Sequence, residues 1–201
     1  MSRVKFSFEK DYLKYELVQK YYTTTNLSLE RHYSKRGNPE YLVDFFGKNE
    51  DIVNKEKVEH QKELSREATF VLLASIEAMF REDFIIRCQA NLTDSISSRF
   101  LAEYNPVKKI YHYKFKELIL NTWKENKPEY ASLLDQLSQA FDYRNWIGHG
   151  RYWQFKDNES KFTFEKVFCL AQMINVAFVS SLYKSEMINS KNKLIKKYDI
   201  Q

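Results

Sequence analysis

The chain has 201 residues, which suffices for one domain with a real core, alone or with an added N-terminal subdomain. It contains only 4 Gly and 3 Pro. So few residues that favour tight turns argue against a many-stranded sheet and favour long helices. The formal net charge of +5 is compatible with a polyanionic partner but does not demonstrate one.

The beginning of the chain has no signal-peptide pattern, because Lys5 and Lys10 interrupt any apolar run. No stretch approaches the roughly 18 apolar residues needed to span a bilayer. We therefore expect a soluble, cytoplasmic protein with no membrane partner. Cys88 and Cys169 both lie in helical apolar patterns. In this compartment we expect both to be small buried hydrophobic residues rather than a disulfide.

Residues 1–56 are predicted to be an N-terminal extension or subdomain, and nothing in them indicates its role. Val4, Phe6 and Phe8 alternate with polar residues, a pattern that permits a short strand. Residues 11–22 have apolar side chains at roughly helical spacing. Residues 33–51 carry two glycines and Asn-Pro, which indicates a loop or a short helix between turns.

Residues 57–190 are predicted to form an all-α bundle, followed by a basic tail at 191–201. Helical spacing of apolar residues marks four segments: 57–90, 92–104, 129–147 and 161–187. The segment 57–90 is apolar on two sides, which is typical of a central helix. Pro106 is expected to end the second helix, and Pro128 to open the third.

The segment between those two prolines is basic and aromatic. Residues 107–128 hold six lysines, including Lys108 and Lys109, against two glutamates, with tyrosine, phenylalanine and tryptophan interleaved. Such a segment could be a track for RNA. The alternative is an amphipathic helix with a solvated lysine face.

Two charged residues lie on apolar helix faces. Arg144 falls in the stripe formed by Leu137 and Ala140, and Glu77 falls in that of Leu73 and Phe80. A buried charge without a partner is costly. Either Glu77 and Arg144 face one another in a polar pocket, or Glu77 pairs locally with the residue four positions on.

The end of the third helix carries a polar cluster. Arg144 and His149 would lie about 140° apart on a straight helix and could not point into one site. Gly148 allows the helix to end and Gly150 allows a second unusual backbone conformation, so the chain can turn His149 back. Asn145 offers an amide that can orient a neighbour. The alternative is ordinary helix capping, in which Asn, Gly and His are all common.

Residues 144–149, Arg-Asn-Trp-Ile-Gly-His, resemble the R-N-x-x-x-H signature of the HEPN superfamily (higher eukaryotes and prokaryotes nucleotide-binding). A chance match is expected in about one in a hundred chains of this composition. The family places this motif late in an all-α bundle, at the end of one helix and before another. Residues 72–84, LLASIEAMFREDF, look like the acidic long helix of many of these proteins. The resemblance covers about residues 57–187 and implies a HEPN-like helical bundle with an N-terminal extension.

The resemblance implies a metal-independent endoribonuclease in which two subunits line a shared cleft. Carried over, Arg144 would hold the scissile phosphate. His149 would be the acid/base group, because imidazole exchanges protons near neutral pH, and Asn145 would orient the histidine or the phosphate. The RNA's own 2′-hydroxyl would attack. The scattered histidines offer no metal-binding pattern, and we expect no cofactor.

Residues around the motif are secondary candidates. Glu77 is a possible acidic partner of the motif arginine. Tyr143, Trp146, Arg151 and Tyr152 could contact RNA, or they could pack in the core or a dimer interface. The resemblance also implies a homodimer that acts in bacterial defence or as a toxin, with an antitoxin or defence-system partner. The alternatives are a HEPN-fold binding or scaffold module without catalysis, and a helical nucleic-acid-binding adaptor.

Overall fold

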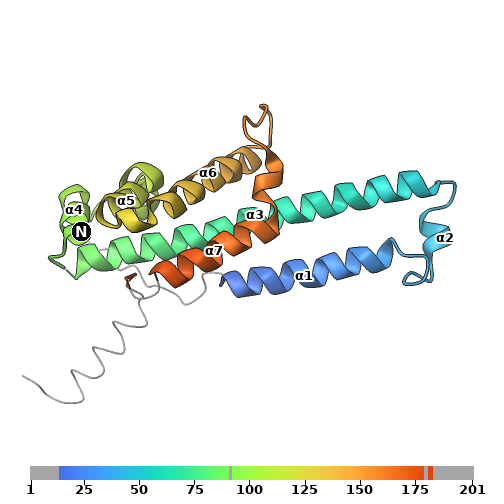
Figure 1. The fold of residues 1–201 in the computed structure, drawn as a ribbon, viewed down its shortest axis with the longest axis horizontal. Helices are drawn as coiled ribbons and strands as arrows, with labels where there is room; N and C mark the ends of the chain where they lie inside the picture. Colours follow the sequence, from blue (N-terminus) through green and yellow to red (C-terminus); the bar gives the residue numbers. More distant parts are fainter. Residues whose placement is uncertain (1–13, 91, 179–180, 183–201) are drawn as a thin grey trace, which may run out of the picture. The chain divides into compact units, whose positions relative to one another are not determined.

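The computed structural model describes residues 14–90, 92–178 and 181–182, and every regular element among them is helical. The predicted all-α class is confirmed for these residues. Seven α-helices are present in them (Figure 1): α1 (Tyr15–His32), α2 (Tyr41–Asp44), α3 (Glu50–Gln89), α4 (Ser95–Glu103), α5 (Asn121–Asn126), α6 (Ala131–Gly148) and α7 (Phe164–Phe178). No helix in the described ranges is both long and apolar enough to cross a bilayer. The strand considered at Val4 and the basic tail lie outside the described residues.

Two helix boundaries differ from the sequence expectation. The long helix begins at Glu50, before the apolar periodicity starts, because the side chain of Asn49 accepts a hydrogen bond from the Ile52 amide (2.9 Å) and caps the helix. Residues 107–128 do not form one amphipathic helix. They form a short 3₁₀ turn (Ile110–His112), a π-helical turn (Phe115–Leu120) and α5. The Tyr113 hydroxyl donates to the Asn105 carbonyl (2.8 Å) and accepts from its amide (2.7 Å), which holds the preceding loop in place.

The chain divides into two compact units, each built from discontinuous segments. Of the described residues, the motif unit contains 14–74 and 140–171. The aromatic-core unit contains 75–90, 92–139, 172–178 and 181–182. The boundary expected at residue 57 falls within α3. The division into extension, bundle and tail stays a prediction.

The aromatic-core unit is organised around fully buried rings. Phe80 of α3, Trp123 of α5 and Phe178 of α7 pack edge to face, with centroids 5.1–6.2 Å apart. Phe84 packs on Phe100 of α4 at 4.9 Å. Because Phe80 and Phe84 have no exposed surface, the prediction of a central, apolar helix is confirmed here.

Buried charges at the end of α3 are paired. Arg87 donates to both carboxylate oxygens of Asp83 (2.9 Å), to Asp94 (2.9 Å) and to the Ser97 hydroxyl (3.1 Å). Asp94 also accepts from the Ser97 amide and caps α4. This network joins the last turn of α3 to the first turn of α4.

In the motif unit, α1 runs antiparallel to the first half of α3 (Figure 1). Glu30 accepts from Lys57 (2.5 Å), and one turn further along, Asn26 accepts from Gln61 (3.1 Å). α1 also meets the first turn of α7, where the ring of Tyr22 stacks on Phe164 at 4.1 Å. Polar pairing and ring stacking thus attach the predicted N-terminal helix to the rest of this unit.

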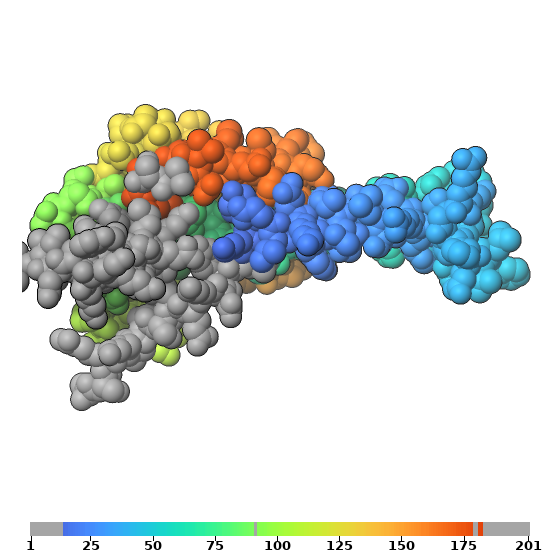
Figure 2. Space-filling model, turned by 90° about the horizontal axis from the view of Figure 1, so that it is seen from below, coloured from blue at the N-terminus to red at the C-terminus, as the bar shows by residue number. Residues whose placement is uncertain are grey.

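The tip of the α1–α3 hairpin exposes apolar side chains. Figure 2 shows α2 and the turns around it at this end of the motif unit. Leu42, Val43 and Phe46 are 77–89% exposed. Beneath them, Tyr33 and Phe45 pack in a small buried cluster that supports the turn.

The two cysteines differ in environment. Cys88 is buried, as predicted, and burial raises the pKa of its thiol to about 12. Cys169 is exposed, so the expectation of a buried residue was wrong. It shares a face of α7 with Glu165 and Lys166, whereas the flanking Phe168 carries the buried stripe. Both thiols are free.

Candidate functional site at the end of α6

A C-terminal cap centred on Gly150 ends α6. The Gly150 amide donates to the Ile147 carbonyl and the Arg151 amide donates to the Trp146 carbonyl, both at 3.0 Å. This is the Schellman pattern, and Gly150 has the positive φ of 79° that the pattern needs. Gly148 remains helical. The helix thus ends at Gly148, and the unusual backbone conformation falls at Gly150, as the two glycines were expected to allow.

Gly148 has a different role, which is to make room for Phe70 of α3. A Cβ at residue 148 would lie 3.0 Å from the Phe70 Cε2 atom. The same ring faces the guanidinium of Arg144, whose central carbon lies 5.1 Å from the ring centroid. The Phe70 ring thus supports the motif arginine through a cation–π contact.

Arg144 and Asn145 are brought together. Nη1 of Arg144 donates to Oδ1 of Asn145 at 3.3 Å. Arg144 is half-buried, while the Asn145 side chain is exposed. The carbonyl of Asn145 accepts the His149 amide at 3.0 Å, so the three motif residues occupy the last turn and the cap of one helix.

His149 is exposed at the cap position. Its ring centroid lies 6.0 Å from that of Trp153, and Trp153 in turn meets Tyr152 edge to face at 4.7 Å. The histidine is therefore open to solvent and has an aromatic neighbour on the following loop.

Glu77 forms the local pair that was one of its two expected arrangements. Its Oε1 accepts from Nε of Arg81 at 2.6 Å, one turn further along α3. Arg81 also donates to the carbonyls of Ile110 and Tyr113, at 2.9 and 3.1 Å. A pair between Glu77 and Arg144 would join the two compact units and stays a prediction.

The residues that flank the motif fall into two groups. Tyr143 and Trp146 are buried and stack on each other with centroids 5.6 Å apart, in agreement with the packing alternative. Tyr152 is 81% exposed. Arg151 has a positive φ of 58° and donates to both carboxylate oxygens of Glu63, at 2.6 and 2.9 Å.

The two lysines proposed as RNA contacts belong to the aromatic-core unit. Both are exposed. The ammonium of Lys108 lies 4.6 Å from the Tyr113 ring centroid, and that of Lys109 lies 5.7 Å from that of Tyr111.

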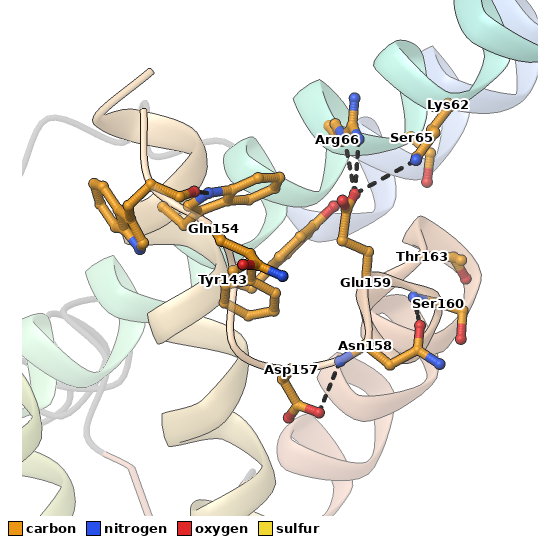
Figure 3. Close-up of a pocket in the computed structure, with 13 residues that line it drawn as sticks. Lys62, Ser65, Arg66, Tyr143, Gln154, Asp157, Asn158, Glu159, Ser160 and Thr163 are labelled. Atoms are coloured by element: carbon orange, nitrogen blue, oxygen red, sulfur yellow. Dashed lines mark hydrogen bonds and ion pairs between the residues drawn. The ribbon is translucent and has the colours of Figure 1, made fainter. Parts of the chain in front are cut away.

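The motif unit contains an open pocket of about 680 Å³ beside the helix end (Figure 3). Its lining comes from α3, from the end of α6 and from the loop that follows: Lys62, Ser65, Arg66, Tyr143, Trp146, Trp153, Gln154, Phe155, Asp157, Asn158, Glu159, Ser160 and Thr163. Sequence reasoning singled out Tyr143 and Trp146 but missed the rest. The loop's polar composition was the available signal, but its partners on α3 lie 93 and 99 residues away along the chain.

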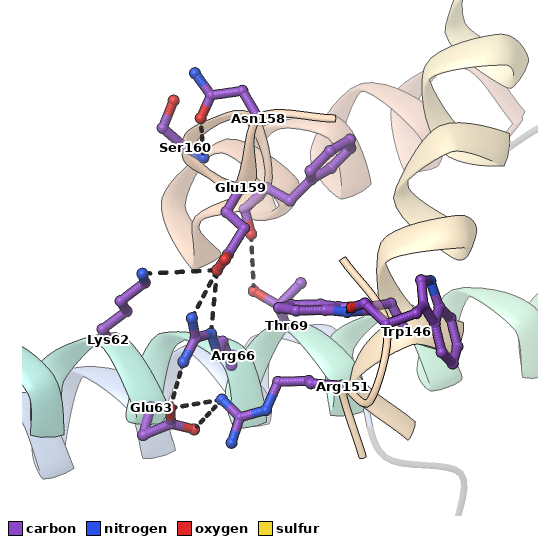
Figure 4. Close-up of polar contacts among 11 residues, drawn as sticks. Lys62, Glu63, Arg66, Thr69, Trp146, Arg151, Asn158, Glu159 and Ser160 are labelled. Atoms are coloured by element: carbon purple, nitrogen blue, oxygen red, sulfur yellow. Dashed lines mark hydrogen bonds and ion pairs between the residues drawn. The ribbon is translucent and has the colours of Figure 1, made fainter. Parts of the chain in front are cut away.

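Three of the lining residues, Lys62, Arg66 and Glu159, belong to a chain of ion pairs that extends beyond the pocket (Figure 4). Glu159 accepts from Nη2 of Arg66 at 2.7 Å and lies 3.8 Å from the ammonium of Lys62. Arg66 also pairs with Glu63, which pairs with Arg151. Three cations thus surround two carboxylates, and the network ties both ends of the loop to α3.

This network changes the acidity of its members. Burial alone would raise the pKa of Glu63, but the hydrogen bond from Arg151 and the charges of Arg66 and Arg151 outweigh burial and lower it below the ordinary value of 4.5. Burial raises the pKa of the Tyr143 phenol, and the charge of Glu159 adds to this effect. At neutral pH Glu63 is therefore ionised and Tyr143 is protonated.

Comparison with known proteins assigns no relative. No family model, no curated protein and no solved structure matches this chain. Among the described residues, no group of three or more His, Cys, Asp and Glu side chains is arranged to hold a metal ion. The chemistry of the site therefore depends on its own side chains. These are an arginine held over a ring, an amide beside it and an exposed imidazole.

Proposed function

We propose that the protein is a HEPN-type endoribonuclease that cleaves RNA without a metal ion. The observation that carries the proposal is the Arg-Asn-x-x-x-His motif in the last turn and cap of α6, with Arg144 and Asn145 hydrogen-bonded and His149 exposed. The all-α class is compatible with the HEPN-like bundle that the resemblance implies.

The chemistry needs only groups that the motif supplies. Arg144, held over Phe70, presents a guanidinium that pairs with a phosphate through charge-assisted hydrogen bonds and stabilises the charge that develops there. His149 accepts the proton of the RNA 2′-hydroxyl as that oxygen attacks the phosphorus atom. The bond to the 5′-oxygen breaks, and that oxygen leaves as a hydroxyl once it is protonated. The products are a 2′,3′-cyclic phosphate and a 5′-hydroxyl.

One chain supplies one motif arginine and one motif histidine, whereas the reaction benefits from both an acid and a base. We therefore propose a two-fold symmetric homodimer with the two motifs close together. Light scattering at micromolar concentration should give twice the mass of one chain. A fully active protein that is strictly monomeric under these conditions would exclude a composite site.

The role in bacterial defence or as a toxin, with an antitoxin or other defence-system partner, is part of the same proposal and rests on the family resemblance. The test of the activity itself is incubation of the purified protein with total RNA in EDTA. Cleavage is expected for the wild type and for His112→Ala, which removes another exposed histidine, and is expected to be lost in His149→Ala.

Arg144→Ala separates binding from chemistry. It should lose cleavage and also bind RNA more weakly, because it removes a charge-assisted contact to the phosphate. His149→Ala should keep nearly full RNA affinity and its melting temperature, because the ring is exposed. If His149→Ala cleaves as fast as the wild type, the activity does not belong to this motif.

A further inference from the structure

The pocket adjoins the motif histidine through one of its lining residues, Trp153. Trp146 of α6 lines the pocket. Trp153 lines it as well, and its ring is the aromatic neighbour of His149 at 6.0 Å. A group stacked on Trp153 would therefore lie near the imidazole that is proposed to move the proton.

The pocket has aromatic walls that are held in place. Nε1 of Trp146 donates to the backbone carbonyl of Trp153 at 2.7 Å, which fixes the loop that carries the second indole. Phe155 packs on Trp146 with centroids 5.3 Å apart. Trp153 keeps 38% of its surface exposed, so a ligand in the pocket can reach it. Every nucleobase has a π-face that stacks on such a ring.

Gln154 gives the pocket a hydrogen-bonding group that is not used elsewhere. Its side-chain amide makes no hydrogen bond to another described residue, and it is exposed. In Figure 3 the amide end points to the side on which Glu159 lies. An amide carries both donors and an acceptor, as does the edge of a nucleobase, so the two can form paired hydrogen bonds.

The charges around the pocket favour a base inside and a phosphate at the rim. Glu159 and Glu63 are engaged with Arg66 on one side, and a carboxylate in this position repels a phosphate. Lys62 is only 3.8 Å from Glu159 and its side chain is 56% exposed. It can therefore turn to a phosphate in solvent at little cost.

We propose that this pocket binds a nucleobase of the RNA, stacked on Trp153 and hydrogen-bonded by the Gln154 amide, beside the proposed acid/base group His149. This inference rests on the proposed function, and it assigns to the site a subsite that selects where the RNA is cut. Lys62 contacts the backbone phosphate that leads into the pocket.

Adenosine 5′-monophosphate is the probe, titrated into the full-length protein by calorimetry, with ribose 5-phosphate as the control that lacks a base. The nucleotide should bind at one site per chain and the sugar phosphate should not. Gln154→Ala should weaken nucleotide binding by about 3- to 10-fold, the effect of one hydrogen bond. Trp153→Leu should weaken it at least about 5-fold. Gln136→Ala, which removes an exposed amide on α6, should leave it unchanged.

Equal binding of the two probes, or wild-type affinity in Gln154→Ala, would overturn the proposal. Gln154 is exposed, so its variant should keep the wild-type melting temperature, and this is measured alongside. Nucleotide binding through Gln154 without any RNA cleavage would refute the proposed function and leave the subsite standing. Cleavage that requires His149, together with no nucleotide binding, would refute the subsite alone.

Discussion

Replacing Gly150 by alanine should destabilise the protein through the backbone alone. Gly150 has φ of 79°, a conformation that costs an L-residue roughly 1–2 kcal/mol. A Cβ at this position would meet no atom within 4 Å, so no clash adds to the cost. For a chain of this size, about 1 kcal/mol corresponds to a fall of about 2–4 °C in melting temperature. Circular dichroism at a helical wavelength during heating measures this fall.

The matched control is Gly150→Asn, because asparagine tolerates the left-handed conformation better than alanine does. We expect it to recover part of the lost stability while adding a larger side chain. If Gly150→Ala melts at the wild-type temperature or above, then α6 does not end at the cap described here. His149 would then not be held at the cap position by Gly150.

Three further predictions concern neighbouring contacts. Gly148→Ala should lower the rate of RNA cleavage more than the melting temperature. The gain in helix propensity offsets the cost of displacing Phe70, but the displaced ring no longer holds Arg144 in place. The melting temperature and the cleavage rate of the variant and the wild type measure the two effects. Arg81→Met should lower the melting temperature more than Glu77→Gln does, since the arginine also binds two backbone carbonyls. Because the pKa of Glu63 is lowered, its ion pairs stabilise the fold above pH 4.5 and the contribution is lost below it; a glutamine there should flatten the acid side of the melting profile.

The helices could be predicted where apolar residues recur at strict spacing. Phe80 and Phe84 mark a central helix because large rings on the same face can only be buried together. The start of α3 could not be predicted in this way. Residues 50–56 are mostly charged, and their helical state depends on the Asn49 cap and on pairs such as Lys57 with Glu30.

The motif could be predicted from spacing, because Arg144, Asn145 and His149 lie within six residues of one another. The closeness of Gly148 to Phe70 could not be predicted, because the two residues lie on different helices and meet only in the folded structure. The pocket could not be predicted either. The pair of Arg66 with Glu159 spans 93 residues of sequence and forms only when α3 and the loop fold together.

The claim of 2′-hydroxyl attack at a metal-free site is tested most directly with a defined RNA that carries a single 2′-deoxy nucleotide at a mapped cleavage position. In EDTA, we expect the wild type to stop cutting at that position and to continue at the others, leaving cyclic phosphate ends that are absent with His149→Ala. Cleavage at the 2′-deoxy position, or complete dependence of cleavage on added magnesium, would contradict the account.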